Sequence, residues 1–88
     1  MAWTIDYLTS AKRELRKLDR QAANRIIDYL DNRVALLENP RSLGIALTDS
    51  KEQLWRYRVG DYRVICEIHD ARLIVLVVRI GHRSEICR

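Results

Sequence analysis

The residues best suited to chemistry in this chain are the arginines between positions 54 and 65. Gly60-Asp61, at the middle of this segment, fits a two-residue hairpin turn, in which glycine tolerates a positive φ. Such a turn pairs Arg58 with Arg63, and because side chains alternate along a strand, Arg56, Arg58 and Arg63 share one face. Like charges directly opposite each other weaken a strand pair. The pattern therefore predicts a surface that binds an anion such as phosphate.

The surroundings of these arginines leave a second interpretation open. The face could simply be solvated, with Glu67 or Asp61 nearby to reduce the repulsion. The opposite face of the same hairpin is apolar, so we expect Trp55 and Tyr57 to be core residues rather than platforms for stacking bases. A second basic group at Arg79, Arg83 and Arg88 favours the phosphate-binding interpretation.

Other basic residues and the two histidines are weaker candidates. Lys12, Arg13 and Arg16 lie on the polar face of a predicted helix, which is either its solvated side or a surface that contacts RNA. His82, beside Arg83, is a candidate to touch a substrate, whereas His69 lies next to a turn and is expected to be inert.

Several other chemistries find no support in the sequence. Cys66 and Cys87 belong to no CxxC pair, the histidines lack the spacing of metal ligands, and we expect free thiols, no metal and no cofactor. No convincing set of serine, histidine and acid, no glycine-rich phosphate loop and no carboxylate pair is present. If the protein is an enzyme, its chemistry must depend on arginines and on the C-terminal residues.

Length and composition predict one small basic domain covering residues 1–88. The chain is 48% hydrophobic and has 16 Lys and Arg against 12 Asp and Glu, a net charge of +4. Most of the basic residues are arginines, whose planar fork suits phosphate recognition. No apolar run approaches the roughly 20 residues of a membrane helix and no signal peptide opens the chain, so we expect a cytoplasmic location and no membrane partner.

Hydrophobic periodicity predicts the elements that must position the arginines. A first strand at 3–7 precedes a helix that Thr9 or Ser10 could cap, and a second helix begins near Asp19 or Gln21 and ends before Asn39-Pro40. A loop at 41–52 leads to strands at 53–59, 61–69 and 72–80, the last ended by Gly81. The order β-α-α-β-β-β predicts an α+β fold in which a helical hairpin packs on a mostly antiparallel sheet.

Over essentially its whole length the chain resembles the RelE branch of the RelE/ParE toxin superfamily. The resemblance rests on Ala-Lys-Arg-Glu-Leu-Arg-Lys-Leu at 11–18, Asn39-Pro40-Arg41, the 55–65 hairpin and Gly81-His82-Arg83. It implies a RelE-like microbial RNase fold and a ribosome-dependent endoribonuclease that cuts messenger RNA in the A site of the 70S ribosome. It also implies inhibition by a RelB-like antitoxin, with operator DNA bound only indirectly, through the toxin–antitoxin complex.

The resemblance also implies roles for individual residues. Arg56 and Arg58 match basic residues on the substrate-facing strand, Arg63 matches the arginine that steadies the phosphate, and Arg83 matches the one that assists the leaving group. Cys87 stands where relatives usually carry a tyrosine, which predicts RNA binding with attenuated cleavage. Two alternatives remain: a ParE-like protein that inhibits DNA gyrase without catalysis, and a decayed toxin that acts as an antitoxin-binding co-repressor.

Overall fold

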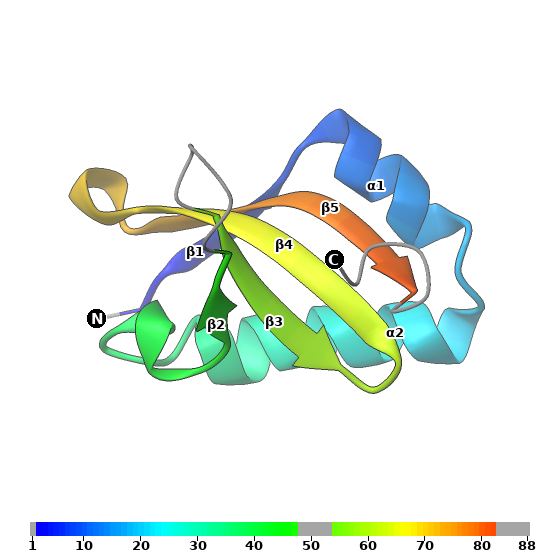
Figure 1. Cartoon of the computed structure of the whole chain (residues 1–88), viewed down its shortest axis with the longest axis horizontal. Helices are drawn as coiled ribbons and strands as arrows, with labels where there is room; N and C mark the ends of the chain where they lie inside the picture. Colours follow the sequence, from blue (N-terminus) through cyan, green and yellow to red (C-terminus); the bar gives the residue numbers. More distant parts are fainter. Residues whose placement is uncertain (1, 48–53, 83–88) are drawn as a thin grey trace.

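A five-stranded sheet and two helices form the architecture of this chain. The structure, a computed structural model, describes residues 2–47 and 54–82. The strands are β1 (Thr4–Tyr7), β2 (Ile45–Ala46), β3 (Trp55–Val59), β4 (Tyr62–His69) and β5 (Ile74–His82), and the helices are α1 (Thr9–Arg16) and α2 (Arg20–Tyr29) (Figure 1). The sheet order is β1-β5-β4-β3-β2, with β1 parallel to β5 and the other neighbours antiparallel. The predicted α+β class is confirmed.

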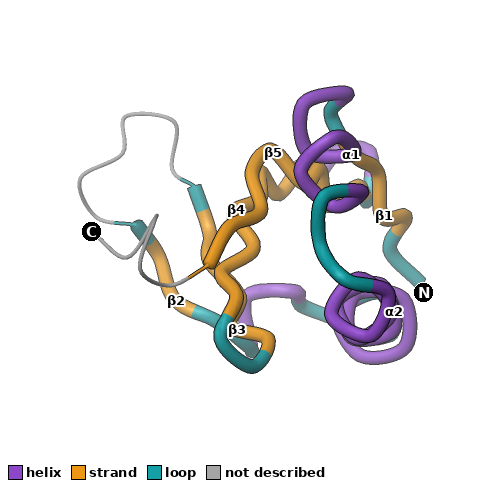
Figure 2. The backbone as a smooth tube through the Cα atoms, turned by 90° about the vertical axis from the view of Figure 1, so that its right-hand side faces the viewer, coloured by secondary structure: helices purple, strands orange, loops and turns teal. Residues whose placement is uncertain are grey.

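Both helices lie on the same side of the sheet, which leaves the other side for the arginines (Figure 2). Apolar residues of the helices and of the inner sheet face share one core, in which Ile26, Leu30, Tyr57, Val64 and Val75 are fully buried. Helix α1 packs mainly on β5, and α2 reaches β3. The helices therefore bury their apolar faces mainly against the sheet. No helix within the described ranges is long and apolar enough to cross a membrane.

The start of α1 and the end of the second helical segment differ from the prediction. Helix α1 follows β1 directly, with Leu8 at its N-cap position and no side-chain cap from Thr9 or Ser10, because the Leu8 N–H donates to Val77 O at 2.9 Å and holds the chain extended. Asp19 does cap α2, accepting a hydrogen bond from the Ala22 N–H at 3.2 Å. A π-helical turn (Leu30–Val34) continues α2, and the helical conformation ends there, earlier than Asn39-Pro40.

Two differences concern the strands. The predicted loop contains β2, whose Ile45 and Ala46 pair with Arg56 and Trp55 of β3. Strand β5 continues through Gly81 to His82, because pairing with Arg63 and Tyr62 of β4 outweighs the weak strand preference of glycine. The start of β5 is delayed to Ile74 by a short 3-10 helix (Asp70–Arg72) that ends in Leu73, at a φ of 55°.

Three aromatic side chains tie the segment at 38–43 to the sheet. Trp3 Nε1 donates to Glu38 O at 3.2 Å, Trp55 Nε1 to Leu43 O at 2.6 Å and the Tyr57 hydroxyl to Pro40 O at 2.6 Å. These bonds satisfy carbonyl groups that no strand or helix partner would reach. Tyr57 is buried and Trp55 is part of the core periphery, as predicted.

Candidate functional site

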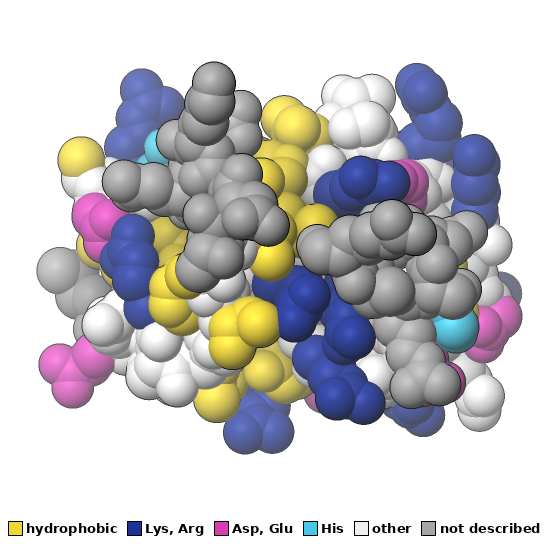
Figure 3. Space-filling view, in the orientation of Figure 1, with side chains coloured by type: hydrophobic (Ala, Val, Ile, Leu, Met, Phe, Trp, Pro, Cys, Tyr) yellow, Lys and Arg dark blue, Asp and Glu magenta, His cyan; other side chains and the backbone are white. Residues whose placement is uncertain are grey.

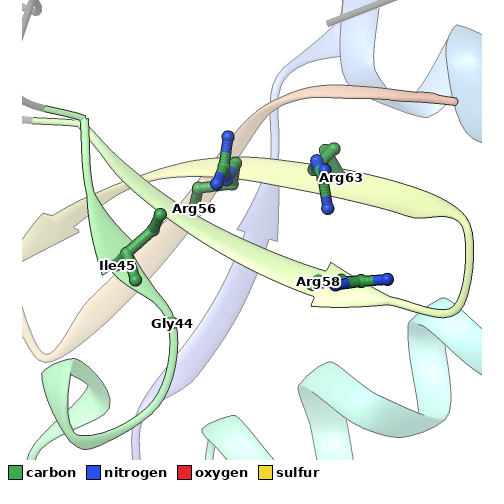
Figure 4. A pocket seen from close by; sticks show the side chains of 5 residues that line it. All are labelled: Gly44, Ile45, Arg56, Arg58 and Arg63. Carbon is green, nitrogen blue, oxygen red and sulfur yellow. The ribbon is translucent and has the colours of Figure 1, made fainter. Parts of the chain in front are cut away.

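Three arginines line one hollow on the sheet face away from the helices. Arg56, Arg58 and Arg63 surround a cavity of about 370 Å³ together with Gly44 and Ile45 (Figure 4). The space-filling view shows Lys and Arg side chains gathered on this face beside exposed hydrophobic ones (Figure 3). We call these three residues the arginine cluster.

The β3–β4 hairpin positions the arginine cluster. The observed register pairs Arg58 with Arg63 and Arg56 with Ile65, as the Gly60-Asp61 turn predicts, and Gly60 has a φ of +59°. Directly opposite residues have Cβ atoms about 4.5–5.5 Å apart, so the guanidinium groups of Arg58 and Arg63 start from neighbouring points. On its other side Arg63 faces Gly81 of β5, which has no side chain to fill the space.

The arginine cluster lacks acidic partners among the described residues. Two ion pairs occur in that part of the chain, Arg41 with Asp70 and His69 with Glu67, both at 2.9 Å. Glu67 therefore pairs with histidine and does not neutralise the cluster. Arg63 Nε is buried and has no hydrogen-bond partner among the described residues. An unpaired buried donor beside two further cations favours an anion as the missing partner.

The other predicted site residues lie elsewhere. Lys12, Arg13 and Arg16 are exposed on α1, on the helix side of the sheet, and do not line the hollow. His82 is paired with Tyr62 across the β4–β5 ladder, and the two rings meet edge to face with centroids 5.6 Å apart. Because Tyr62 alternates with Arg63 along β4, His82 occupies the face opposite the arginine cluster. Arg83 and Cys87 lie outside the described residues.

Gly44 and Ile45 complete the hollow, and the sequence prediction missed both. Gly44 has a φ of +78°, and an added Cβ would collide with the Arg56 carbonyl oxygen and lie 2.7 Å from Trp55 Nε1. Only glycine therefore allows β2 to approach β3 this closely. Ile45 is 51% exposed and forms an apolar wall beside the charges. The available signal was an apolar Leu-Gly-Ile-Ala run, at 43–46, within a segment that otherwise resembled a loop.

A third residue missed from the sequence is Glu14, on α1. Its Oε1 accepts a hydrogen bond from the Ile80 N–H at 2.8 Å, on a part of β5 beyond its pairing with β1. The carboxylate thus replaces a neighbouring strand as acceptor and fixes the end of β5 that leads to Gly81.

Cysteine and metal chemistry have little structural basis in the described residues. Cys66 is a free, buried thiol, and burial raises its pKa well above the usual range, which keeps it protonated and unreactive. Within residues 2–47 and 54–82, no three His, Cys, Asp or Glu side chains gather in a way that could hold a metal ion.

Comparison with known proteins identifies the family of the chain. The family model described as the ParE toxin of the type II toxin-antitoxin system parDE matches residues 5–87. Toxin RelE of Mycobacterium tuberculosis is 35% identical over 75 residues, which cover 85% of this chain and 75% of that toxin. Toxin RelG of the same organism is 27% identical over 88 residues, which cover 100% of this chain and 99% of that toxin.

Solved structures show the same fold. The toxin–antitoxin complex RelBE2 of M. tuberculosis contains a chain with a TM-score of 0.81 and 24% identity, covering 96% of this chain and 94% of that one. The archaeal RelE–RelB complex of Pyrococcus horikoshii contains a chain with a TM-score of 0.69 and 21% identity, covering 96% of this chain and 98% of that one. The chain therefore belongs to the RelE/ParE family of toxins from type II toxin–antitoxin systems.

Proposed function

We propose that this toxin is an endoribonuclease that cleaves messenger RNA in the ribosomal A site. The observation that carries the proposal is the arginine cluster, which has no acidic partner among the described residues and contains the buried, unpaired Nε of Arg63. Cations placed in this way suit the charge that develops on a phosphate during transfer.

The reaction is attack by a ribose 2′-hydroxyl on the adjacent phosphorus. The 2′-hydroxyl gives its proton to a base, which is the role proposed for the side chain at position 87, or to water, and the 2′-oxygen bonds to phosphorus. The bond from phosphorus to the 5′-oxygen breaks, and the leaving oxygen takes a proton from water. The products are a 2′,3′-cyclic phosphate and a 5′-hydroxyl. Arg63 and Arg58 hold the phosphate and stabilise its added negative charge, and Arg56 extends the binding surface. Arg83 supports the leaving oxygen mainly through its charge, because a guanidinium does not give up its proton in proteins.

Cys87 is the residue that limits this activity. Relatives usually carry a tyrosine there, which can reach the phosphate and stack on a base, whereas cysteine lacks the ring. General-base assistance is commonly worth about 10²–10⁴-fold. We therefore expect Cys87→Tyr to raise cleavage strongly while antitoxin affinity stays unchanged, as measured by mapping messenger RNA ends and by titration with the antitoxin. Equal cleavage by the two proteins would mean that position 87 is not catalytic in this chain.

The partners in this proposal are the 70S ribosome, its messenger RNA and a RelB-like antitoxin in the cytoplasm. The exposed Lys12, Arg13 and Arg16 would contact ribosomal RNA, and His82, at the end of β5 on the face opposite the arginine cluster, would contact RNA other than the scissile phosphate. Relatives of known structure from M. tuberculosis and P. horikoshii form complexes with antitoxins. Operator DNA would be reached only through such a complex.

One experiment separates this function from its alternatives. A purified translation reaction receives the toxin, the 5′ ends of the messenger RNA are mapped, and gyrase supercoiling is assayed in parallel. The matching family description favours gyrase inhibition as the second candidate. New A-site ends support the nuclease, loss of supercoiling alone supports the gyrase inhibitor, and neither effect, together with antitoxin binding, supports the co-repressor.

A further inference from the structure

A fourth arginine shares the outer face of the sheet with the arginine cluster. Arg79 of β5 pairs with Ile65 of β4, which pairs with Arg56 of β3, which in turn pairs with Ile45 of β2. These four residues form a cross-strand row with two cations and two isoleucines. Arg58, Arg63 and Gly81 form the adjacent row.

A β-bulge puts Arg79 on this face. The register of β4 with β5 shifts between Ile65 and Cys66, so that Arg79 faces Ile65 whereas Val77 faces Cys66. Val77 and Ile80 are buried on the core side, at 0% and 3% exposure, and Val78 is the extra residue. Without the extra residue, strict alternation from Val77 would point residue 79 into the core. The bulge therefore allows an arginine to be exposed two residues after a buried valine.

The two rows have a spacing that suits a nucleic acid backbone. Residues two apart along a strand are separated by about 6.6 Å, which is comparable with the distance between successive phosphates of an extended strand. Arg56 and Arg79 are two strands apart, about 10 Å between backbones, and their long side chains can converge above Ile65. Ile45 is 51% exposed and adds apolar surface at one end of the row, whereas Ile65, at 8% exposure, is buried between the two arginines' strands.

The charges favour a bound anion at the row that contains Arg56 and Arg79, as they do at the row that contains Arg58 and Arg63. Arg79 is exposed and forms no ion pair with any described residue. Glu14, the acidic residue of the neighbouring helix, has its Oε1 bonded to the Ile80 N–H on the strand edge. Arg56 and Arg79 thus flank the same isoleucine without a described carboxylate to neutralise them.

We propose that Arg56 and Arg79 bind the phosphate next to the scissile phosphate, so that the toxin holds two successive phosphates of single-stranded RNA. This inference rests on the proposed function, which assigns the scissile phosphate to Arg58 and Arg63. The bulge at Val78 then serves substrate binding, because it determines on which face the second cation lies.

The test uses 70S ribosomes programmed with messenger RNA that carries a 2′-O-methyl group at the attacking ribose, so that RNA is bound but not cut. Dissociation constants are measured for the full chain and for Arg79→Gln, Arg79→Lys, Arg63→Gln and Arg72→Gln. Arg72 is a matched control, because it is an exposed arginine at the opposite end of β5. Each protein is also measured with a neutral methylphosphonate in place of the phosphate on the 5′ or the 3′ side of the scissile one.

We expect Arg79→Gln to weaken binding about tenfold, and to have no further effect when one of the two neighbouring phosphates is already neutral. For Arg79→Gln, the slope of log K against log salt concentration should become less steep by about 0.7, because one phosphate contact to a single strand is lost. Arg79→Lys should retain most of the affinity, and Arg72→Gln should bind like the unchanged protein.

Other results would overturn the inference in distinguishable ways. If Arg63→Gln weakens binding and Arg79→Gln behaves like Arg72→Gln, the second phosphate site is wrong and the proposed function stands. If Arg79→Gln weakens antitoxin binding but not RNA binding, Arg79 belongs to a protein interface instead. If the unchanged protein does not bind, or if Arg63→Gln has no effect, the proposed function itself fails.

Discussion

Arg63 combines the charge that we propose binds phosphate with an incomplete set of hydrogen bonds. Its buried Nε–H has no described partner, and leaving a buried donor unpaired costs about 1–3 kcal/mol. Such a cost is common at binding sites, where the ligand supplies the missing acceptor. The residue is therefore expected to matter more for activity than for folding.

This expectation gives a prediction for Arg63→Ala. Loss of one charge-stabilising contact costs roughly 2.7–4 kcal/mol in well-ordered sites, so ribosome-dependent cleavage should fall by at least about tenfold. The free energy of unfolding, measured by urea titration, should stay the same or rise, because an unsatisfied donor is removed. Unchanged cleavage by the folded variant would contradict the assignment.

Two buried tyrosine hydroxyls allow a matched prediction on stability. The Tyr57 hydroxyl donates to Pro40 O at 2.6 Å, whereas the Tyr7 hydroxyl is buried without a described partner. Tyr57→Phe should lower the free energy of unfolding by about 1–3 kcal/mol, because it leaves a carbonyl unpaired. Tyr7→Phe should be neutral or stabilising. Urea denaturation of both variants tests the pair, and equal losses would argue against the difference in hydrogen bonding.

Alkaline pH provides a second measurement on the Tyr7→Phe variant. Burial, followed by the nearby charge of Asp31, raises the pKa of Tyr7 to about 12. The folded state thus favours the neutral phenol, so this contribution to stability is full below the unfolded pKa near 10 and is lost as pH rises toward 12. As the pH rises from about 10 to about 12, the Tyr7→Phe variant should therefore lose less stability than the unchanged protein.

At the scale of elements, β2 is held in place by a glycine that no other residue can replace without strain. Gly44→Ala would place a methyl group against the Arg56 carbonyl oxygen, at a φ of +78°. We expect a loss of about 1–3 kcal/mol in the free energy of unfolding, together with weaker RNA binding, because Ile45 would move away from the arginine cluster. Thermal unfolding and RNA affinity measure the two effects. Gly60→Ala is a useful comparison, since its added Cβ would meet the flexible end of Arg25 at 3.4 Å, outside the hollow.

The β3–β4 hairpin could be predicted from sequence because its information is local. The Gly60-Asp61 turn fixes the register, and alternation then places Arg58 beside Arg63. Strand β2 could not be predicted in this way, since two residues show no periodicity and their pairing depends on Gly44 packing against β3. The same reasoning applies to Gly81, where tertiary pairing with Arg63 extends β5 through a residue that usually ends a strand.

For the whole molecule, the most consequential property is a basic face whose arginines have no acidic partner among the described residues, on a chain of net charge +4. An acidic partner that folds on this face would relieve the repulsion among the arginines. We predict that a RelB-like antitoxin encoded beside the gene co-purifies with the toxin, raises its melting temperature and relieves growth arrest. Purification of an active toxin that ignores this gene product would show the prediction to be wrong.

Residues that meet through local register could be placed from the sequence, whereas residues that meet through long-range pairing could not. Arg56, Arg58 and Arg63 come from one hairpin, so their meeting follows from local register. The apolar wall that Ile45 forms and the hydrogen bond from the Ile80 N–H to Glu14 arise from contacts between distant parts of the chain. His82 was predicted to lie beyond a strand that in fact contains it, and its face depends on the pairing of β4 with β5. Such long-range pairings have no signature in a single sequence.

The intrinsic fluorescence of Trp55 can report events at the arginine cluster. Its Nε1 donates to Leu43 O at 2.6 Å, next to Gly44 in the wall of the hollow, and the second tryptophan, Trp3, bonds to Glu38 O. In a Trp3→Phe variant, the emission would come from Trp55 alone, which responds to changes in local polarity and field. Titration with an oligonucleotide would then change the wavelength or intensity of emission without any attached dye. The fluorescence of Trp55 would also report the pairing of β2 with β3 during folding. The rate at which the site folds and the rate at which it binds an oligonucleotide could therefore be measured separately in one sample.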